Sequence, residues 1–424
     1  MTGVPARLRI ASLAAGGEGV GRLPDGRAVF VPRTAPGDLV ELGPLREHRS
    51  WARAESGRVV EPGPDRVAPR CPHYDGDRCG GCQWQHLSAP AQRRARAAIV
   101  GEALRRLGGL DLPDPDVEPA PADWGYRHKL TLHRDAAGRI GLHPLGRPVE
   151  SFDLRRCEIA HEDLNRLWQA VDPRRDLLPR RLQRLVLRRT REGALHLVAE
   201  VEAGEATWPG AEGLHQHLLG SGLQASLWVA AGRASQVKGR RRGRDSRLAT
   251  RDSRLVAGKG GEDPGAFEQV SAVMGDRIRQ FAVGSLGDLA GRHAWDLYAG
   301  IGETTELLAA AGASVESVEV ARPHDGRTAR RTAGWHDARV EDVVGRLARP
   351  DVVITNPPRT GMDARAVDGI AAAGPARIAY VSCDPATLAR DLRRLDGYRL
   401  AGVRAFDLFP QTAHVETVAV LERR

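Results

Sequence analysis

The stretch VSCDPATLARD, residues 381–391, predicts a strand that turns directly into a helix. The apolar run 378–381 reads as the end of a strand, and Asp384-Pro385 opens a helical pattern with its proline in the first turn. Cys383 is therefore expected at the strand's carboxyl end, where open α/β sheets bind ligands. A thiol near a helix N-terminus can become a nucleophile because its pKa is lowered. The alternative for a lone cysteine is a small buried residue.

The sequence from residue 264 onward alternates strand-like and helix-like segments, which predicts a doubly wound α/β sheet. Strands are expected near 293–298, 315–320, 351–355, 376–382, 399–406 and 414–421. The first strand leads into a D-x-x-x-G-x-G loop made by Asp296, Gly300 and Gly302, where a ligand can approach the backbone at a helix start. Glu319 ends the second strand, and an acidic side chain there can bind both hydroxyls of an adenosine ribose.

Two further segments belong to the same predicted sheet. DVVITNPPRTG, residues 351–361, places Asn356-Pro357-Pro358-Arg359 after an apolar strand, and the two prolines stiffen the loop. FPQTAHVETVAVLER, residues 409–423, places His414 and Glu416 at the start of the last strand. Apolar surroundings would raise the pKa of Glu416 and suit it to proton transfer.

Length and charge restrict the class of protein. A chain of 424 residues is expected to form two or three domains, and its net charge of +9 fits a polyanionic partner. It contains no apolar run near the roughly 20 residues that span a bilayer, and its N-terminus lacks a signal pattern. We expect a cytoplasmic protein without membrane contact. Nothing in the sequence forces a dimer, so a monomer is assumed.

Four of the five cysteines suggest a metal site. Three lie in a C-x7-C-x2-C pattern and one lies far downstream: Cys71, Cys79, Cys82 and Cys157. Four thiolates can hold either zinc or a four-iron four-sulfur cluster, and the spacing does not separate the two. His73 and His86 are competing ligands that would favour zinc.

The N-terminal segment predicts a small barrel of the OB type. Short strand-like runs at 7–14, 28–32 and 38–45 are separated by turn residues, and Asp25-Gly26 is a hairpin signal. Such barrels bind nucleic acid on an open face. The residues expected to contact phosphates and bases are basic or aromatic: Arg33, Arg46, His48, Arg49, Trp51 and Arg53.

The middle of the chain predicts a helix followed by a sheet. Residues 88–108 read as an amphipathic helix with Ser88 as its N-cap, and its arginines form either a solvated face or an RNA contact. Several alternating runs in 126–202 indicate the antiparallel strands of a central α+β domain. The arginine-rich residues 232–262 indicate a flexible basic segment or linker.

In combination these motifs resemble the iron–sulfur-containing RNA (uracil-5-)-methyltransferases that carry an N-terminal TRAM domain. The resemblance rests on residues 17–42, CPHY…CGGCQWQHLS, YRHKLTL, GLHPL, RRCEI and the motifs of the C-terminal sheet. It implies a TRAM barrel over 1–62, a central domain over 63–262, and a Rossmann-like S-adenosylmethionine-dependent methyltransferase domain over 263–424. The family has a hairpin where this chain has residues 232–262, so the segment is either a degenerate hairpin or one that orders only on RNA.

The resemblance also implies roles for individual residues. Cys71, Cys79, Cys82 and Cys157 would hold a four-iron four-sulfur cluster. The methyl donor, S-adenosylmethionine, would contact Gln269, Tyr298, Gly300, Gly302, Glu319 and Asn356. The sequence departs from the family's pattern at three places. The first loop of the cysteine cluster is longer than usual, Asn356 replaces an aspartate, and Ser271 replaces an asparagine.

The expected reaction is methylation of carbon 5 of a uridine in RNA, most simply 23S rRNA. The Cys383 thiolate would attack carbon 6, and Glu416 would remove the proton from carbon 5 after methyl transfer. Transfer RNA is the alternative substrate. Two rival readings stay open: an amino-group methyltransferase, suggested by Asn-Pro-Pro-Arg, and an RNA-binding paralogue with a degenerate donor site.

Overall fold

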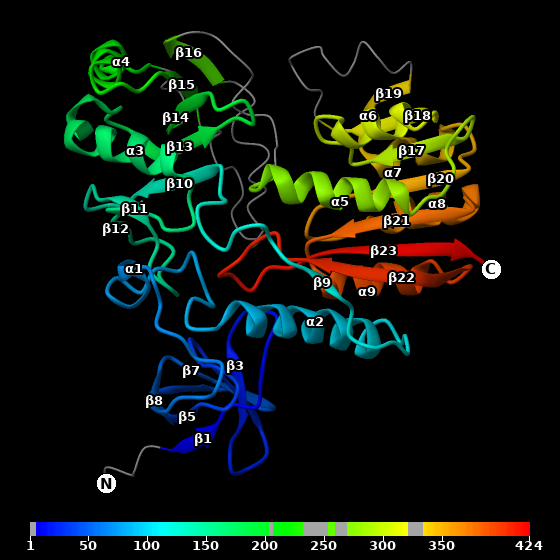
Figure 1. The fold of residues 1–424 in the computed structure, drawn as a ribbon, viewed down its shortest axis with the longest axis horizontal. Coiled ribbons are helices and arrows are strands. Elements are labelled where there is room, and N and C mark those ends of the chain that lie inside the picture. The colour runs from blue at the N-terminus through cyan, green and yellow to red at the C-terminus, as the bar shows by residue number, and fades with distance from the viewer. Residues whose placement is uncertain (1–5, 203–206, 232–252, 259–268, 321–333) are drawn as a thin grey trace. The chain divides into compact units, whose positions relative to one another are not determined.

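The computed structural model describes residues 6–202, 207–231, 253–258, 269–320 and 334–424 (Figure 1). The chain divides into two compact units, each built from separate stretches of sequence. Unit 1 comprises residues 1–69, 82–121 and 273–424, and unit 2 comprises residues 70–81 and 122–272. The three domains expected from the sequence, 1–62, 63–262 and 263–424, stay a prediction.

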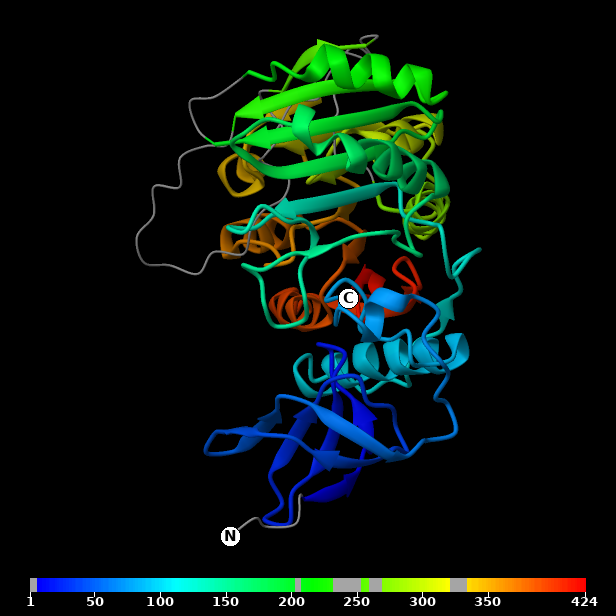
Figure 2. The ribbon, with the colours of Figure 1, turned by 90° about the vertical axis from the view of Figure 1, so that its left-hand side faces the viewer.

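The N-terminal part of unit 1 forms two small sheets, drawn in blue in Figure 2. One sheet has the order β1(Arg7–Arg9), β5(Leu39–Leu42), β8(Gly57–Glu61). The other has the order β2(Ser12–Leu13), β3(Gly19–Arg22), β4(Ala28–Val31), β7(Trp51–Ala54), β6(Leu45–Glu47). Val29, Val31, Val40 and Ala52 form the centre of their shared core. Gly26 has a φ of +85° between the antiparallel strands β3 and β4, which confirms the predicted hairpin.

The middle segment of unit 1 carries the long helix α2(Ala89–Arg106). The Ser88 hydroxyl accepts a hydrogen bond from the Ala91 N–H, so the predicted N-cap is confirmed. Positions four residues apart form a buried stripe: Gln92, Arg96, Val100 and Leu104. Val100 and Leu104 join the core of the C-terminal sheet, and the helix packs on β9, β22 and α9.

The C-terminal part of unit 1 is an eight-stranded α/β sheet, and the expected alternation of strands and helices is confirmed. Its order is β19(Gly334–Asp337), β18(Ser314–Glu319), β17(His293–Leu297), β20(Val352–Thr355), β21(Arg377–Ser382), β23(Glu416–Arg423), β22(Tyr398–Phe406), β9(Val117–Glu118). Strands β17 to β21 pair in parallel, whereas β23 runs antiparallel to both of its neighbours. The sequence did not predict β19 or the edge strand β9.

Helices cover both faces of this sheet (Figure 1). One face carries α7(Val340–Val343), α8(Ala364–Ala373), α9(Pro385–Arg394) and α2, whose apolar residues share a core with Trp295, Tyr380 and Ala419. The other face carries α5(Ala272–Gly284), because the Phe281 and Phe406 rings meet edge to face with centroids 5.7 Å apart. Successive residues of each strand therefore alternate between two buried surfaces.

Unit 2 is built around a seven-stranded sheet. Its order is β12(Phe152–Asp153), β11(Ile140–Leu142), β10(Lys129–Arg134), β13(Leu182–Arg189), β14(Leu195–Val201), β15(Ala225–Ala231), β16(Ser253–Ala257). All pairs are antiparallel except β14 with β15. Its helices are α1(Pro72–Asp75), α3(Glu162–Val171) and α4(Ala211–Gly220), with a 3-10 turn at Asp172–Leu177.

The arginine-rich segment expected to be a linker is only partly described. Residues 253–257 form the edge strand β16, so the linker interpretation was wrong for these five residues. Residues 232–252 and 259–262 lie outside the described part of the chain.

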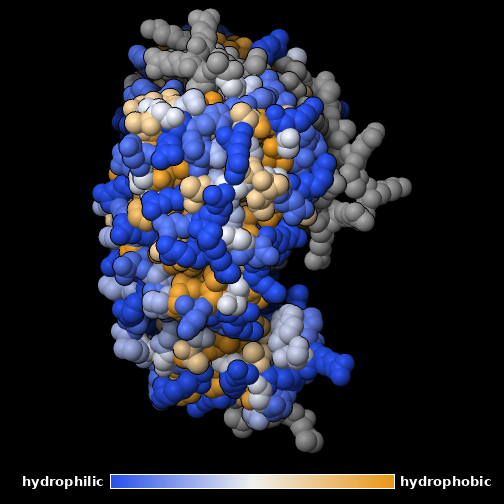
Figure 3. All heavy atoms as spheres, turned by 90° about the vertical axis from the view of Figure 1, so that its right-hand side faces the viewer, coloured by the Kyte–Doolittle hydropathy of each residue, from blue (hydrophilic) through white to orange (hydrophobic). Residues whose placement is uncertain are grey.

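The surface is mixed in polarity. Figure 3 shows one face on which hydrophilic side chains predominate, with smaller apolar groups between them. No helix within the described ranges has the length and apolar composition needed to cross a membrane.

Candidate active site

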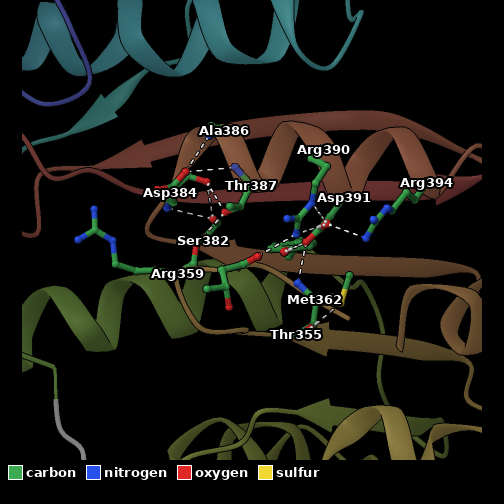
Figure 4. A network of polar contacts seen from close by, with 12 residues as sticks. Thr355, Arg359, Met362, Ser382, Asp384, Ala386, Thr387, Arg390, Asp391 and Arg394 are labelled. Carbon is green, nitrogen blue, oxygen red and sulfur yellow. Dashed lines mark hydrogen bonds and ion pairs between the residues drawn. The ribbon is translucent and has the colours of Figure 1, made fainter. Parts of the chain in front are cut away.

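Cys383 lies in a short turn between β21 and α9, as the sequence predicted. The Asp384 carboxylate accepts hydrogen bonds from the N–H groups of Ala386 and Thr387 at 3.0 and 3.1 Å (Figure 4). Ser382 closes the turn, since its hydroxyl accepts from the Asp384 N–H and donates to the Asp384 carbonyl. Cys383 is partly exposed and lies at the carboxyl edge of the sheet, where open α/β sheets bind ligands.

Glu416 is the first residue of β23 and only 3% exposed. Strands β21 and β23 are antiparallel, with Ser382 opposite Thr417. Cys383 follows the last residue of β21, and Glu416 is the first residue of β23. Glu416 pairs with Phe406, whose ring meets Phe281 of α5. Because directly paired residues project from the same face of a sheet, the Glu416 side chain lies on the α5 side. The two residues expected to carry the chemistry therefore lie at the same end of two neighbouring strands.

The predicted donor loop lies between β17 and α6(Glu303–Ala310). Tyr298, Gly300 and Gly302 all adopt positive φ, at 62°, 63° and 89°. This conformation is strained for tyrosine and easy for glycine. The Gly300 N–H donates to Glu319 Oε2 at 3.0 Å, which joins the ends of two neighbouring strands. The structure thus brings together four of the six residues expected at the donor site, Tyr298, Gly300, Gly302 and Glu319.

A buried carboxyl group supports this loop from below. The pKa of Asp296 is raised to about 7, mainly by burial and to a smaller extent by the neighbouring Glu319 carboxylate. The Thr305 hydroxyl donates to Asp296 Oδ2 at 2.6 Å and lies 2.9 Å from the Ser317 hydroxyl. These contacts join β17, α6 and β18 directly beneath the donor loop.

The Asn356-Pro357-Pro358-Arg359 loop follows β20 and begins beside the donor loop, because the Asn356 N–H donates to the Leu297 carbonyl at 3.1 Å. Helix α9 holds the residues that follow. The hydroxyl of Thr387 donates to the Arg359 carbonyl at 3.2 Å, and Arg390 donates to the Thr360 carbonyl at 2.9 Å. The Arg359 side chain is exposed and extends away from this network (Figure 4).

Asp391 is the centre of this network, and the sequence analysis missed it. Its fully buried Oδ2 atom accepts from the Met362 N–H at 2.8 Å and from the Tyr380 hydroxyl at 2.7 Å. Arg390 pairs with the same carboxylate at 2.7 Å. Thr387, Arg390 and Asp391 follow an i, i+3, i+4 pattern, which indicates one helix face. That spacing was the available signal.

A second network, also missed, surrounds the 407–415 loop that leads into Glu416. Arg96 and Gln92 of α2 contact it, and both are buried. The expectation that the arginines of this helix form a solvated or RNA-binding face was wrong for Arg96. The sequence did carry an indication of this burial. Gln92 and Arg96 are spaced four residues apart on the same helix face as the apolar residues Val100 and Leu104.

The four clustered cysteines are all buried. Burial raises the pKa of the Cys157 thiol, and the Cys71 thiol raises it further, so these two lie near each other within unit 2. His73 uses both ring nitrogens in unit 2, with Nδ1 2.6 Å from Asp77 and Nε2 accepting the Arg155 N–H. Among the described residues, no three His, Cys, Asp or Glu side chains form a group that could hold a metal ion. The metal site stays a prediction.

Two other groups of predicted residues are described in part. Gln269 is a half-buried residue of unit 2, whereas the preceding residues 265–268 lie outside the described ranges. On the N-terminal sheets, the His48 and Trp51 rings stack with centroids 3.8 Å apart. Arg53 lies 5.6 Å from the Trp51 ring centroid, so an aromatic and cationic surface is present there.

Comparison with known proteins identifies relatives over nearly the whole chain. The profile of the tRNA (Uracil-5-)-methyltransferase family matches residues 335–424. An uncharacterized RNA methyltransferase of Gloeobacter violaceus is 34% identical, over 98% of this chain and 95% of that protein. The 23S rRNA (uracil(1939)-C(5))-methyltransferase of Chromohalobacter salexigens is 33% identical, over 98% of this chain and 89% of that protein.

A solved structure shares the fold. Pyrococcus abyssi tRNA (uracil-54, C5)-methyltransferase, in complex with S-adenosyl-L-homocysteine, aligns with a TM-score of 0.72 and 23% identity. The alignment covers 98% of this chain and 100% of that one. The sequence relatives and the family profile indicate the same class of protein, an RNA (uracil-5-)-methyltransferase, and the solved structure agrees with them in fold. The chain therefore belongs to the S-adenosylmethionine-dependent RNA (uracil-5-)-methyltransferase family.

Proposed function

We propose that this enzyme methylates carbon 5 of a uridine in 23S rRNA through a covalent adduct with Cys383. The single observation that supports the proposal is the antiparallel pairing of Ser382 with Thr417, because Cys383 and Glu416 are the next residues beyond this pair at the same end of the two strands. A nucleophile and a base on opposite sides of one pyrimidine ring need to approach each other in this way. An amino-group methyltransferase needs neither residue.

The chemistry of the two residues follows from the reactivity of uracil. Carbon 5 is a weak nucleophile, and attack of the Cys383 thiolate on carbon 6 converts the ring to an enolate that is nucleophilic at carbon 5. S-adenosylmethionine supplies the electrophilic methyl group when bound. The Glu416 carboxylate then takes the proton from carbon 5, the carbon 5–carbon 6 double bond re-forms, and the thiolate leaves. Elimination regenerates the Cys383 thiolate, and the Glu416 carboxylate is regenerated when its proton passes to water.

The donor would bind across the ends of β17, β18 and β20. The Glu319 carboxylate would accept hydrogen bonds from the ribose hydroxyls. A carboxylate has enough acceptor positions to do so while it keeps its hydrogen bond from the Gly300 N–H. The positive φ of Gly300 and Gly302 leaves backbone groups accessible at the start of α6. Tyr298, Asn356 and Gln269 would complete the site. The amide of Asn356 keeps an acceptor without the negative charge of the family's aspartate.

Cys71, Cys79, Cys82 and Cys157 would hold the four-iron four-sulfur cluster. The burial of all four thiols supports this proposal, because a cluster is best protected in a site with little water. We expect iron and acid-labile sulfide in the purified protein, and their loss in Cys157→Ser. Zinc without sulfide would reject the cluster in favour of a tetrahedral zinc site.

RNA binding would begin at the TRAM-like sheets of residues 7–61. The stacked His48 and Trp51 rings with Arg53 beside them support this role, since single-stranded bases stack on such surfaces. We expect Trp51→Ala to weaken binding of an rRNA fragment, at fixed salt, without changing S-adenosylmethionine affinity. Equal binding by Trp51→Ala would remove this surface from the RNA site.

Mapping 5-methyluridine in cellular RNA identifies the substrate. We expect 5-methyluridine to disappear from one 23S rRNA position in cells lacking this protein, and to return with the wild-type gene but not with Cys383→Ala. Loss from transfer RNA instead would assign the alternative substrate. Retained turnover by Cys383→Ala would instead indicate methylation without a covalent adduct, as for an amino group. A wild-type protein without affinity for S-adenosylmethionine would be an RNA-binding paralogue.

A further inference from the structure

The 407–415 loop connects β22 to Glu416 and is held at several points by one arginine of α2. Arg96 Nη2 donates to the carbonyls of Phe409 and Thr412 at 3.0 and 2.8 Å. Its Nε atom donates to the His414 carbonyl at 3.0 Å, only two residues before Glu416. Its Nη1 atom lies 3.2 Å from Asp407 Oδ1. One side chain thus contacts both ends and the middle of the loop.

Gln92, one helical turn earlier, holds the same loop through Gln411. The Gln92 Nε2 group donates to Gln411 Oε1 at 3.0 Å, and the Gln411 N–H donates to Gln92 Oε1 at 2.9 Å. Gln411 adopts a positive φ of 69°, an unusual conformation that needs outside support. The Gln411 carbonyl accepts from the N–H groups of Gln83 and Trp84 at 3.1 and 2.9 Å, which provides such support.

The chemistry of arginine explains why these contacts are made by that residue. The guanidinium group presents five N–H donors in a rigid plane, so a single group can bind three carbonyls and a carboxylate in fixed directions. Arg96 and its partner Asp407 are almost completely buried, at 0% and 1% exposure. The Arg96 guanidinium carbon also lies 5.2 Å from the Trp84 ring centroid. A lysine at this position could keep the charge but not the directions.

We propose that Arg96, assisted by Gln92, is a positioning residue that fixes Glu416 for proton removal from carbon 5. The inference rests on the proposed function, in which Glu416 is the base. Arg96 acts through the 407–415 loop rather than on the substrate. Loosening the loop should therefore slow the elimination step, while attack by Cys383 and methyl transfer continue. A displacement of about 1 Å at a reacting group can lower a rate about 100-fold.

The test measures adduct formation and product release separately in the Arg96→Lys variant. Arg94→Lys is the matched control. Arg94 lies on the same helix and pairs with Asp65, but its side chain is exposed. Each variant is mixed with an RNA fragment containing the target uridine and S-adenosylmethionine, and stopped in denaturant at timed intervals. The covalent protein–RNA adduct and the free methylated RNA are then measured.

We expect Arg96→Lys to accumulate the methylated covalent adduct and to release product about 100-fold more slowly, with unchanged affinity for S-adenosylmethionine. Arg94→Lys should match the wild type. Glu416→Gln should show the same accumulation, and the double variant should be no slower than Glu416→Gln alone, because both changes affect one step. A purely structural role for Arg96 would lower adduct formation and release together.

The outcomes distinguish the two proposals. If Glu416→Gln does not accumulate adduct, the assignment of the base is wrong. If Glu416→Gln accumulates adduct but Arg96→Lys behaves like Arg94→Lys, the positioning role is wrong. Gln92→Met provides a second, milder variant if Arg96→Lys does not fold, judged by circular dichroism. It should show accumulation in the same direction, and its failure to do so would also overturn the inference.

Discussion

The Cys383 turn carries the proposed nucleophile and the 407–415 loop leads to the proposed base, but the two regions are stabilised in different ways. The Cys383 turn is held by its neighbours, since Ser382 and Asp384 make contacts only two or three residues away. The 407–415 loop is held by Arg96 and Gln92, more than 300 residues earlier in the chain. The position of the proposed nucleophile thus depends on local sequence, whereas the position of the proposed base depends on the assembled tertiary structure.

The difference has an energetic consequence. A capped turn forms with its helix and can be weakened only by about the energy of a cap. The 407–415 loop depends on a buried ion pair, and removing one partner leaves an uncompensated charge in the interior. Substitutions far from Glu416 in the sequence should therefore damage the second region more than any local change damages the first.

The largest effect is expected for Arg96→Met. The change leaves Asp407 buried without its cation and removes the Arg96 donor from three carbonyls, so we expect the free energy of unfolding to fall by about 3–5 kcal/mol. Urea titration followed by circular dichroism measures it. Arg94→Met, which removes an exposed pair, should cost at most about 1 kcal/mol. Equal losses in the two variants would erase the contrast between the regions.

A pH effect at β17 must be separated from pH effects at the 407–415 loop. The pKa of Asp296 is about 7 in the folded protein against 3.8 for the ordinary group, so the folded state holds the proton more tightly. The contribution of the Asp296 proton to the free energy of unfolding is fully present below pH 3.8 and is lost as pH rises through about 7. The difference between the two pKa values corresponds to about 4 kcal/mol of stability.

We therefore expect wild-type stability to decline between about pH 4 and 7 in unfolding titrations and to level off above that range, because only there do the folded and unfolded states differ in bound protons. Asp296→Asn should remove most of the decline. Asp368→Asn, at an exposed position on α8, serves as the control. An unchanged pH dependence in Asp296→Asn would assign the effect to another group.

The network at Asp391 offers an intermediate case, because α9 stabilises the Asn356–Arg359 loop through contacts of moderate sequence separation. Asp391→Ala leaves the Met362 N–H and the Tyr380 hydroxyl without their acceptor, and should cost about 2–3 kcal/mol. It should also slow adduct formation, since this helix begins at the Cys383 turn. The exposed Asp396→Ala should be neutral within about 0.5 kcal/mol. If Asp391→Ala formed the covalent adduct normally but released methylated RNA slowly, Asp391 would support the proposed base Glu416 and not the Cys383 turn.

The smallest effects compare two helix caps. Asp384→Ala and Ser88→Ala each remove a side-chain acceptor from a helix N-terminus, and each should lower stability by about 1 kcal/mol. Only Asp384→Ala should also slow adduct formation, because only that cap adjoins Cys383. Single-turnover adduct kinetics measure the difference. A similar slowing by Ser88→Ala would mean that both caps act through overall stability.

The features predictable from sequence were those written in short stretches. The strand, turn and helix around Cys383, the Ser88 cap and the donor-loop glycines were all found in the structure as expected. Strand β19 was missed, and so was β9, which has two residues and exists only by pairing with β22. Short strands carry too little periodicity to be recognised alone.

The supporting residues of the site could not be predicted for a related reason. Arg96 looked like one of several surface arginines of an amphipathic helix, and its burial depends on partners after residue 406. Asp391 could have been placed on a helix face, but not against Met362 and Tyr380. Hydrogen bonds across a fold leave little trace in the local pattern of either segment.

The discontinuity of unit 1 affects how the protein can be made. The strand β9 and the helix α2 leave the ribosome before residue 122, whereas β22 and α9, on which they pack, emerge only after residue 384. The buried polar stripe of α2 must wait through the synthesis of unit 2, which is a natural stage for chaperone binding. A fragment of residues 273–424 would lack both α2 and β9 and would expose the edge of β22. We therefore expect this fragment to aggregate when it is expressed alone.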